Sequence, residues 1–132
     1  MEKVIDLFKN DKFSARAGIE IVETLPGYAK CSMEVTEDHL NGIGVLMGGA
    51  TFTLADFTFS LAANGYGTIA VSQNANITYV RKCKRGMVTA IATEISRTKR
   101  IGVYRVSIID QDNQLIAEFT GTCYFREPEI RT

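Results

Sequence analysis

The stretch from Asn41 to Asp56 is the part of the chain best suited to chemistry. Gly48 and Gly49 stand at the start of a strongly apolar helical segment. Glycines let a ligand approach the backbone closely, and the first N–H groups of a helix have no acceptor within the helix and lie at its positive end. Asp56 lies in the middle of the segment, where a buried carboxylate is costly unless it has partners or a task. The segment therefore indicates a site that uses backbone N–H donors and a carboxylate.

The helix that carries Asp56 is predicted over residues 49–64, the longest segment without a helix-breaking residue. It ends before Gly65, a typical C-terminal stop. Apolar residues lie nearly all round it, which predicts a largely buried helix. The polar exceptions Thr53, Asp56 and Ser60 are spaced i, i+3 and i+7, so they share one stripe.

The other elements follow from hydrophobic periodicity and turn residues. A short amphipathic helix is predicted over 4–10, a loop over 36–44, and strands over 18–23, 28–35, 69–79, 87–98, 101–110 and 115–125. An antiparallel sheet wrapped around one long apolar helix satisfies this order, because the sheet has a face to cover and the helix covers it. We therefore predict an α+β fold in one domain over residues 1–132.

Three features of the glycine-rich segment are similar to a known family: Asn41, the Gly48-Gly49 pair, and the run Leu54-Ala55-Asp56. The pattern resembles the central helix of hotdog-fold acyl-CoA thioesterases, in the branch that includes the phenylacetate-pathway thioesterases. Met47 stands where that family usually has a histidine. The strand over 71–79 also looks like the family's strand after the helix, so the resemblance spans nearly the whole chain. It implies the hotdog fold and hydrolysis of an acyl- or aryl-CoA thioester.

The resemblance implies roles for four residues. Asp56 is expected to activate water or attack the thioester carbonyl, and the Gly48 N–H to hold the developing oxyanion. Asn41 is expected to support the thioester or a water, and Ser72 to hold the attacking water. Each has a structural alternative: a hydrogen-bonded carboxylate at an interface, close packing at the glycines, a turn at Asn41-Gly42, and an ordinary strand position for Ser72.

The spacing of Gly48 and Asp56 makes a prediction of its own. Eight residues of helix separate the two by about 12 Å, so both cannot reach one carbonyl carbon within about 3 Å. If both act, they come from different subunits, and a two-fold dimer with helices side by side provides this. The resemblance implies the same, because the family's active sites lie at the dimer interface. We expect a homodimer or a dimer of dimers.

Basic residues gather in two predicted loops, Arg81, Lys82, Lys84 and Arg85 in one and Lys99 and Arg100 in the other. A solvated surface explains them, and so does a site for coenzyme A phosphates. The resemblance favours the phosphate site slightly. The predicted substrate-binding residues are Met47, Gly49, Arg81, Lys82, Lys99 and Arg100. The aromatic residues Phe52, Phe57, Phe59 and Tyr79 are candidates for an acyl or aryl pocket, and core packing explains them equally well.

Composition excludes several other classes. Lys+Arg and Asp+Glu both number 15, which argues against a general nucleic-acid binder. No run approaches 18 apolar residues, and the start of the chain has no signal-peptide core, so a cytoplasmic protein without a membrane span is expected. The three cysteines, Cys31, Cys83 and Cys123, are expected to be reduced apolar fillers. No metal cluster is evident, and no cofactor is expected beyond coenzyme A as part of the substrate.

Two other functions remain open at this point. The first is a non-catalytic protein that binds or senses acyl-CoA on the same fold, which Met47 favours and Asp56 disfavours, because a binder has no need of a buried carboxylate. The second is a hydratase, which requires an Asp/His pair. The only histidine, His39, lies seventeen residues before Asp56 and outside the helix.

Overall fold

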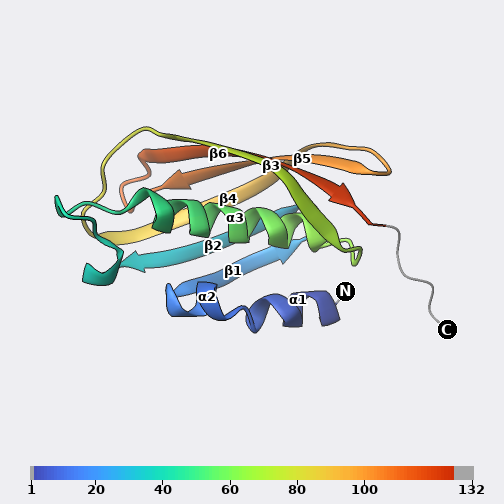
Figure 1. Cartoon of the computed structure of the whole chain (residues 1–132), viewed down its shortest axis with the longest axis horizontal. Coiled ribbons are helices and arrows are strands. Elements are labelled where there is room, and N and C mark those ends of the chain that lie inside the picture. The colour runs from blue at the N-terminus through green and yellow to red at the C-terminus, as the bar shows by residue number, and fades with distance from the viewer. Residues whose placement is uncertain (1, 127–132) are drawn as a thin grey trace.

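The computed structural model describes residues 2–126 (Figure 1). Its elements in chain order are α1 (Glu2–Lys9), α2 (Lys12–Arg16), β1 (Ile19–Leu25), β2 (Tyr28–Val35), the one-turn 3-10 helix η1 (Glu37–His39), α3 (Gly48–Asn64), β3 (Ala70–Tyr79), β4 (Gly86–Arg97), β5 (Ile101–Ile109) and β6 (Leu115–Phe125). The strands form one antiparallel sheet in the order β1-β2-β4-β5-β6-β3. α3 lies along one face of the sheet, and α1 and α2 lie beside β1 (Figure 1). The predicted sheet wrapped around a long helix is confirmed.

The element boundaries differ from the predicted ones in small ways. Every predicted strand is present, with each end within two residues. α3 begins at Gly48, one residue early, because Met47 takes the extended conformation of the cap (φ −69°, ψ 140°). The predicted loop over 36–44 contains η1. The pattern missed α2, since its five residues KFSAR show no apolar period.

Aromatic packing fixes α3 against the sheet. The Phe59 ring lies 5.5 Å from the Tyr104 ring and 5.7 Å from the Phe119 ring, centroid to centroid. A Cβ on Gly121 of β6 would come within 2.8 Å of the Phe59 ring, so this glycine lets the helix lie close to the sheet. Phe52 meets the same cluster through Phe119. Cys31, Cys83 and Cys123 are buried without disulfides, as expected of apolar fillers.

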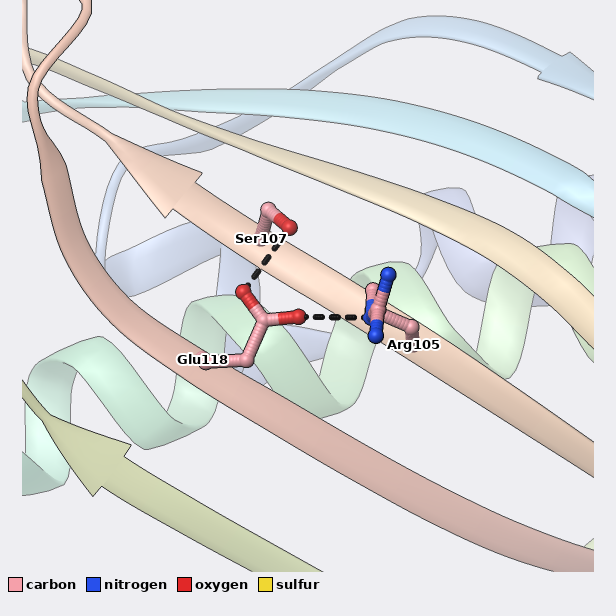
Figure 2. Close-up of polar contacts among 3 residues, drawn as sticks. All are labelled: Arg105, Ser107 and Glu118. Atoms are coloured by element: carbon pink, nitrogen blue, oxygen red, sulfur yellow. Dashed lines mark hydrogen bonds and ion pairs between the residues drawn. The ribbon is translucent and has the colours of Figure 1, made fainter.

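The opposite face of the sheet is polar. On adjacent strands, Ser107 Oγ donates to Glu118 Oε1 at 2.9 Å, and Arg105 Nε lies 2.8 Å from Glu118 Oε2 (Figure 2). Figure 2 shows these three side chains on the side of the sheet away from α3. The Arg105 side chain is 63% exposed, so this ion pair contributes at most about 1 kcal/mol to stability. One face therefore holds the core, and the other faces solvent in the single subunit.

The two edge strands are protected to different degrees. β1 carries Glu20 and Glu23, has a bulge between Ile21 and Glu23, and packs against α2. β3 has ten residues, AVSQNANITY, without a charge or a proline, and most of them are exposed. Charges, prolines and bulges are the usual protection of a free sheet edge. Apart from one bulge at Gln73, β3 has none of these.

Candidate active site

The first turn of α3 presents backbone donors at a fixed angle. The Met47 carbonyl accepts the N–H groups of Ala50 at 3.0 Å and Thr51 at 3.2 Å, and the Thr51 hydroxyl at 3.4 Å. The Met47 carbonyl and the Gly48 N–H belong to one planar peptide, so these bonds aim the Gly48 N–H away from the helix. The first N–H groups of a helix have no acceptor within it, and Met47 makes no side-chain cap. The Gly48 N–H is therefore available to a ligand.

Tyr79, the last residue of β3, closes one side of this turn. Its hydroxyl donates to the Gly48 carbonyl at 2.9 Å. A Cβ on Gly48 would lie 3.0 Å from both Cζ and Oη of Tyr79, so any larger residue would have to displace the ring. The glycine at position 48 therefore serves close packing as well as exposing its N–H.

Asn41 shapes the loop that leads into the helix. Its Oδ1 accepts the N–H groups of Ile43 at 3.1 Å and Val45 at 3.2 Å, and its own N–H donates to the Val45 carbonyl at 2.9 Å. The turn alternative is thus confirmed for the side-chain oxygen. The Nδ2 group has no partner among the described side chains of residues 6–126 or the backbone of this part of the chain, so its two N–H donors remain available.

His39 stabilises the same loop through hydrogen bonds of its ring and of its carbonyl. Its Nδ1 accepts the Thr36 N–H at 2.9 Å, and its Nε2 lies 2.7 Å from the Ala17 carbonyl. Since a carbonyl only accepts, Nε2 carries the proton. The His39 carbonyl accepts the Met47 N–H at 2.8 Å. Both ring nitrogens are thus engaged with backbone, and this histidine has a structural role that the sequence did not reveal.

Asp56 lies in the middle of α3 with its carboxylate half-buried. Thr53, Asp56 and Ser60 are all partly exposed along the helix, which confirms the predicted polar stripe. Burial, and then the negative charge of Asp11, raise the pKa of the Asp56 carboxyl. Among residues 6–126, whose side chains the structure describes, no donor or cation bonds this carboxylate. A half-buried acid without a partner is costly to the fold, which points to a chemical task.

Ser72 lies far from the helix start. It pairs in register with Cys123, whose buried side chain faces α3, so Ser72 lies on the helix side of the sheet. β3 runs antiparallel to α3: Tyr79 meets Gly48 at one end, and the Ala70 N–H donates to Asn64 Oδ1 at 2.9 Å at the other. Ser72 is therefore near the end of α3. One subunit brings together the helix start, Asn41 and Tyr79, but not Asp56 or Ser72.

A cavity of about 350 Å³ opens beside the helix start. Its lining includes Leu46, Thr51, Tyr79, Arg81 and Lys82. Arg81 Nη1 donates to the Leu115 carbonyl at 2.8 Å, which holds this guanidinium at the cavity. The cavity thus has an apolar lining, two cations and the helix start at its side. Of the four candidate aromatics, Tyr79 lines this cavity, while Phe57 and Phe59 are buried and Phe52 packs on Phe119.

The second basic pair, Lys99 and Arg100, occupies the turn between β4 and β5, and Arg100 Nη1 donates to the Tyr124 hydroxyl at 2.8 Å. Arg81 and Lys82 precede β4 and this pair follows it. Because twelve strand residues extend about 36–40 Å, the two basic groups lie at opposite ends of one subunit's sheet.

A family model described as the thioesterase superfamily matches residues 43–117, more than half of the chain. The chain belongs to the thioesterase superfamily. This thioesterase is 34% identical to the acyl-coenzyme A thioesterase PaaI of Escherichia coli, over 87% of this chain and 83% of that protein. It is 39% identical to human acyl-coenzyme A thioesterase 13, over 58% of this chain and 56% of that protein.

Solved structures place the thioesterase in the hotdog fold, as predicted. The E. coli PaaI protein from the phenylacetic acid degradation operon superposes with a TM-score of 0.92 at 31% identity, over 98% of this chain and 95% of that one. A variant of the PaaI protein of Thermus thermophilus gives a TM-score of 0.83 at 36% identity, over 86% of this chain and 98% of that one. The thioesterase is therefore a thioester hydrolase on a well-represented scaffold.

Among residues 6–126, no group of three or more His, Cys, Asp or Glu side chains is placed to hold a metal ion. None of the helices in this part of the chain is both long and apolar enough to cross a membrane.

Proposed function

We propose that this thioesterase hydrolyses an acyl- or aryl-coenzyme A thioester to the free acid and coenzyme A. The half-buried Asp56 carboxylate, which has no hydrogen-bond or ion-pair partner among the side chains of residues 6–126, carries the proposal. It lies within residues 43–117, the part of the chain that the thioesterase superfamily model matches. A raised pKa makes a carboxylate a stronger base, as general-base catalysis near neutral pH requires.

In the proposed reaction, the thioester carbonyl oxygen accepts the Gly48 N–H at the start of α3. Asp56 of the other subunit removes a proton from water that attacks the carbonyl carbon, or attacks that carbon directly to form an anhydride that water then hydrolyses to the free acid. The negative charge that develops on the oxygen is stabilised by donors already held in place. Asn41 supplies its free Nδ2 donors to the thioester or to a water, and Ser72 holds the attacking water. The coenzyme A thiolate leaves, and no cofactor takes part.

The uncharged edge of β3 supports a homodimer as the active unit. Two copies of β3 paired about a two-fold axis would satisfy this free edge. The midpoint between Gly48 and Asp56 lies about 6 Å from Gly48 along α3. Because Tyr79 contacts Gly48 and β3 runs alongside α3, the same distance along β3 is about two residues from Tyr79. An axis that crosses β3 near Ile77 would therefore bring Asp56 of each subunit beside Gly48 of the other. Two such dimers could associate as a dimer of dimers.

The same axis would unite the two basic loops. A two-fold axis reverses the strand direction, so the turn with Lys99 and Arg100 of one subunit would lie at the sheet end that carries Arg81 and Lys82 of the other. Arg and Lys are the residues that bind phosphate. The joined basic end is the proposed site for the coenzyme A phosphates, with Met47 and Gly49 beside the thioester.

The second candidate is a non-catalytic acyl-CoA binding or sensing protein. Met47 favours it, because a methionine at the helix start is 54% exposed and provides no hydrogen-bond donor to a substrate. A measurement of turnover separates the two candidates, because both predict binding and only the thioesterase predicts release of thiol.

The test is thiol release from short, long and aryl acyl-CoAs by wild type, Asp56→Asn and Asp6→Asn. Asp6 is an exposed carboxylate on α1, so its variant controls for loss of one negative charge. We expect Asp56→Asn to remain folded and to lose on the order of 10²–10⁴-fold in kcat, while Asp6→Asn matches wild type. A wild-type rate in Asp56→Asn would exclude the proposed role of Asp56. Saturable binding without any thiol release by the wild type would establish the binding protein instead.

A further inference from the structure

Tyr79 is a half-exposed residue with an unusually specific contact. Its side chain is 51% exposed, yet its hydroxyl donates to the Gly48 carbonyl at 2.9 Å, across 31 residues of sequence. Its Cζ and Oη would lie only 3.0 Å from a Cβ on Gly48. The same ring lines the cavity beside the helix start. Tyr79 thus belongs to the edge strand β3, contacts the start of α3 and lines the cavity beside it.

The Tyr79 hydrogen bond acts on the peptide that joins Gly48 and Gly49. The Gly48 carbonyl and the Gly49 N–H belong to the same planar unit and point in opposite directions. A hydrogen bond to the carbonyl fixes the plane and polarises the peptide, which makes its N–H a better donor. As the second residue of α3, Gly49 has no acceptor for its N–H within the helix. The Tyr79 hydroxyl therefore orients the Gly49 N–H, just as the bonds to the Met47 carbonyl orient the Gly48 N–H.

We propose that Tyr79 is a positioning residue for the oxyanion site. Its hydroxyl holds the Gly48–Gly49 peptide so that the Gly49 N–H acts with the Gly48 N–H on the thioester oxygen. This role rests on the proposed thioesterase function. Donors that are fixed before reaction stabilise developing charge most, because they need no reorganisation when the charge forms. The hydroxyl therefore acts on the transition state more than on the bound substrate.

Tyr66 provides a matched control. Its hydroxyl also bonds an oxygen on another element, lying 3.0 Å from Glu94 Oε1. Tyr66 follows the C-terminal end of α3, far from Gly48. Tyr66→Phe and Tyr79→Phe each remove one hydroxyl from a partly exposed phenol, so a general effect of the substitution appears in both.

The experiment compares wild type, Tyr79→Phe, Tyr79→Leu and Tyr66→Phe after circular dichroism and sedimentation show equal fold and mass. We expect kcat of Tyr79→Phe to fall about tenfold with KM within about twofold, kcat of Tyr79→Leu to fall at least as far, and Tyr66→Phe to match wild type. A non-hydrolysable fluorinated ketone analogue, whose hydrate resembles the tetrahedral intermediate, should bind Tyr79→Phe more weakly, while a thioether analogue without the carbonyl should bind it as it binds wild type.

Wild-type kcat in Tyr79→Phe, an equal loss in Tyr66→Phe, or an equal loss of affinity for the thioether would overturn the role of Tyr79. So would a Tyr79→Phe protein that does not fold, because the hydroxyl would then be structural. The binding measurements do not depend on turnover. A wild type that binds the ketone through Tyr79 but hydrolyses nothing would reject the proposed function and leave carbonyl recognition by this site in place.

Discussion

The negative charge of Asp11, at the start of α2, acts on the Asp56 carboxylate in the middle of α3. Burial is the larger cause of the raised pKa of Asp56, and Asp11 is the second. Asp11 is held in place by Ser14, whose hydroxyl donates to Asp11 Oδ2 at 2.6 Å. Through the charge of Asp11, a five-residue helix that the sequence pattern missed helps to raise the pKa of the proposed catalytic group.

Replacing Asp11 should move the pH profile. The proposed base works when deprotonated, so a raised pKa places the acidic limb of kcat/KM at higher pH than an ordinary aspartate would. Asp11→Asn removes one cause and leaves burial, so the limb should shift to lower pH but remain above the usual value of 3.8. Rates from about pH 4 to 8, with Asp6→Asn as control, measure the shift. An unmoved limb would show that Asp11 does not tune the active carboxylate.

Loss of the Asp56 charge should stabilise the fold. Because the folded-state pKa is raised, stability is fully present below the unfolded pKa and falls as pH rises through the folded value. Asp56→Asn removes this penalty, so its thermal midpoint at neutral pH should exceed that of wild type. The difference should shrink as pH falls and the wild-type carboxyl is protonated. A lower midpoint for Asp56→Asn at every pH would instead identify Asp56 as a hydrogen-bonded structural carboxylate.

Met47→His should restore a donor beside the helix start. One oxyanion donor contributes roughly 3 kcal/mol at the upper end, and less is expected here because the backbone N–H groups remain. We expect kcat/KM for some acyl-CoA to rise about tenfold, or 1.4 kcal/mol. Met47→Leu is the matched control and should match wild type, because neither side chain donates. If folded Met47→His is unchanged or slower, Met47 is not a lost donor.

Charges on β3 should separate the subunits. Pairing near Ile77 would set Asn76 of one strand opposite Thr78 of the other, so Asn76→Lys with Thr78→Lys creates like charges face to face. We expect a folded monomer by sedimentation at micromolar concentration, without acyl-CoA hydrolysis. Thr120→Lys, on β6 in register with Asn76, controls for a lysine on the same face and should remain paired and active. A double-lysine monomer with full activity would refute the shared site.

Local patterns predicted most of this fold. Alternating apolar residues located the strands, and an uninterrupted apolar segment located α3, because both signals lie within a few neighbouring residues. The candidate site residues Asn41, Gly48 and Asp56 also came from one short segment, through its glycines and carboxylate and its resemblance to the thioesterase helix. Other contacts had no local signal. The Tyr79 hydroxyl meets Gly48 only because β3 returns along α3. His39 reaches the Ala17 carbonyl only because the β1–β2 hairpin brings these distant residues together.

In the proposed dimer, Asp56 and the thioester beside Gly48 belong to different subunits, so the distance between them cannot be predicted from one chain. Eight helical residues separate Gly48 and Asp56, and because the rise of a helix is fixed, the spacing alone predicts a site shared between subunits. The spacing does not say which surface would meet the second subunit. The proposal for that surface required the sheet order and the uncharged edge of β3.

The uncharged edge of β3 also has a consequence for folding and aggregation. A freshly synthesised chain that has folded alone exposes ten uncharged residues of strand to whatever it meets first. Any extended segment can add to such an edge, including those of unfolded neighbours, and in the proposed dimer a second copy would cover it. Assembly of that dimer would therefore compete with aggregation, and its yield would depend on the local supply of folded identical chains.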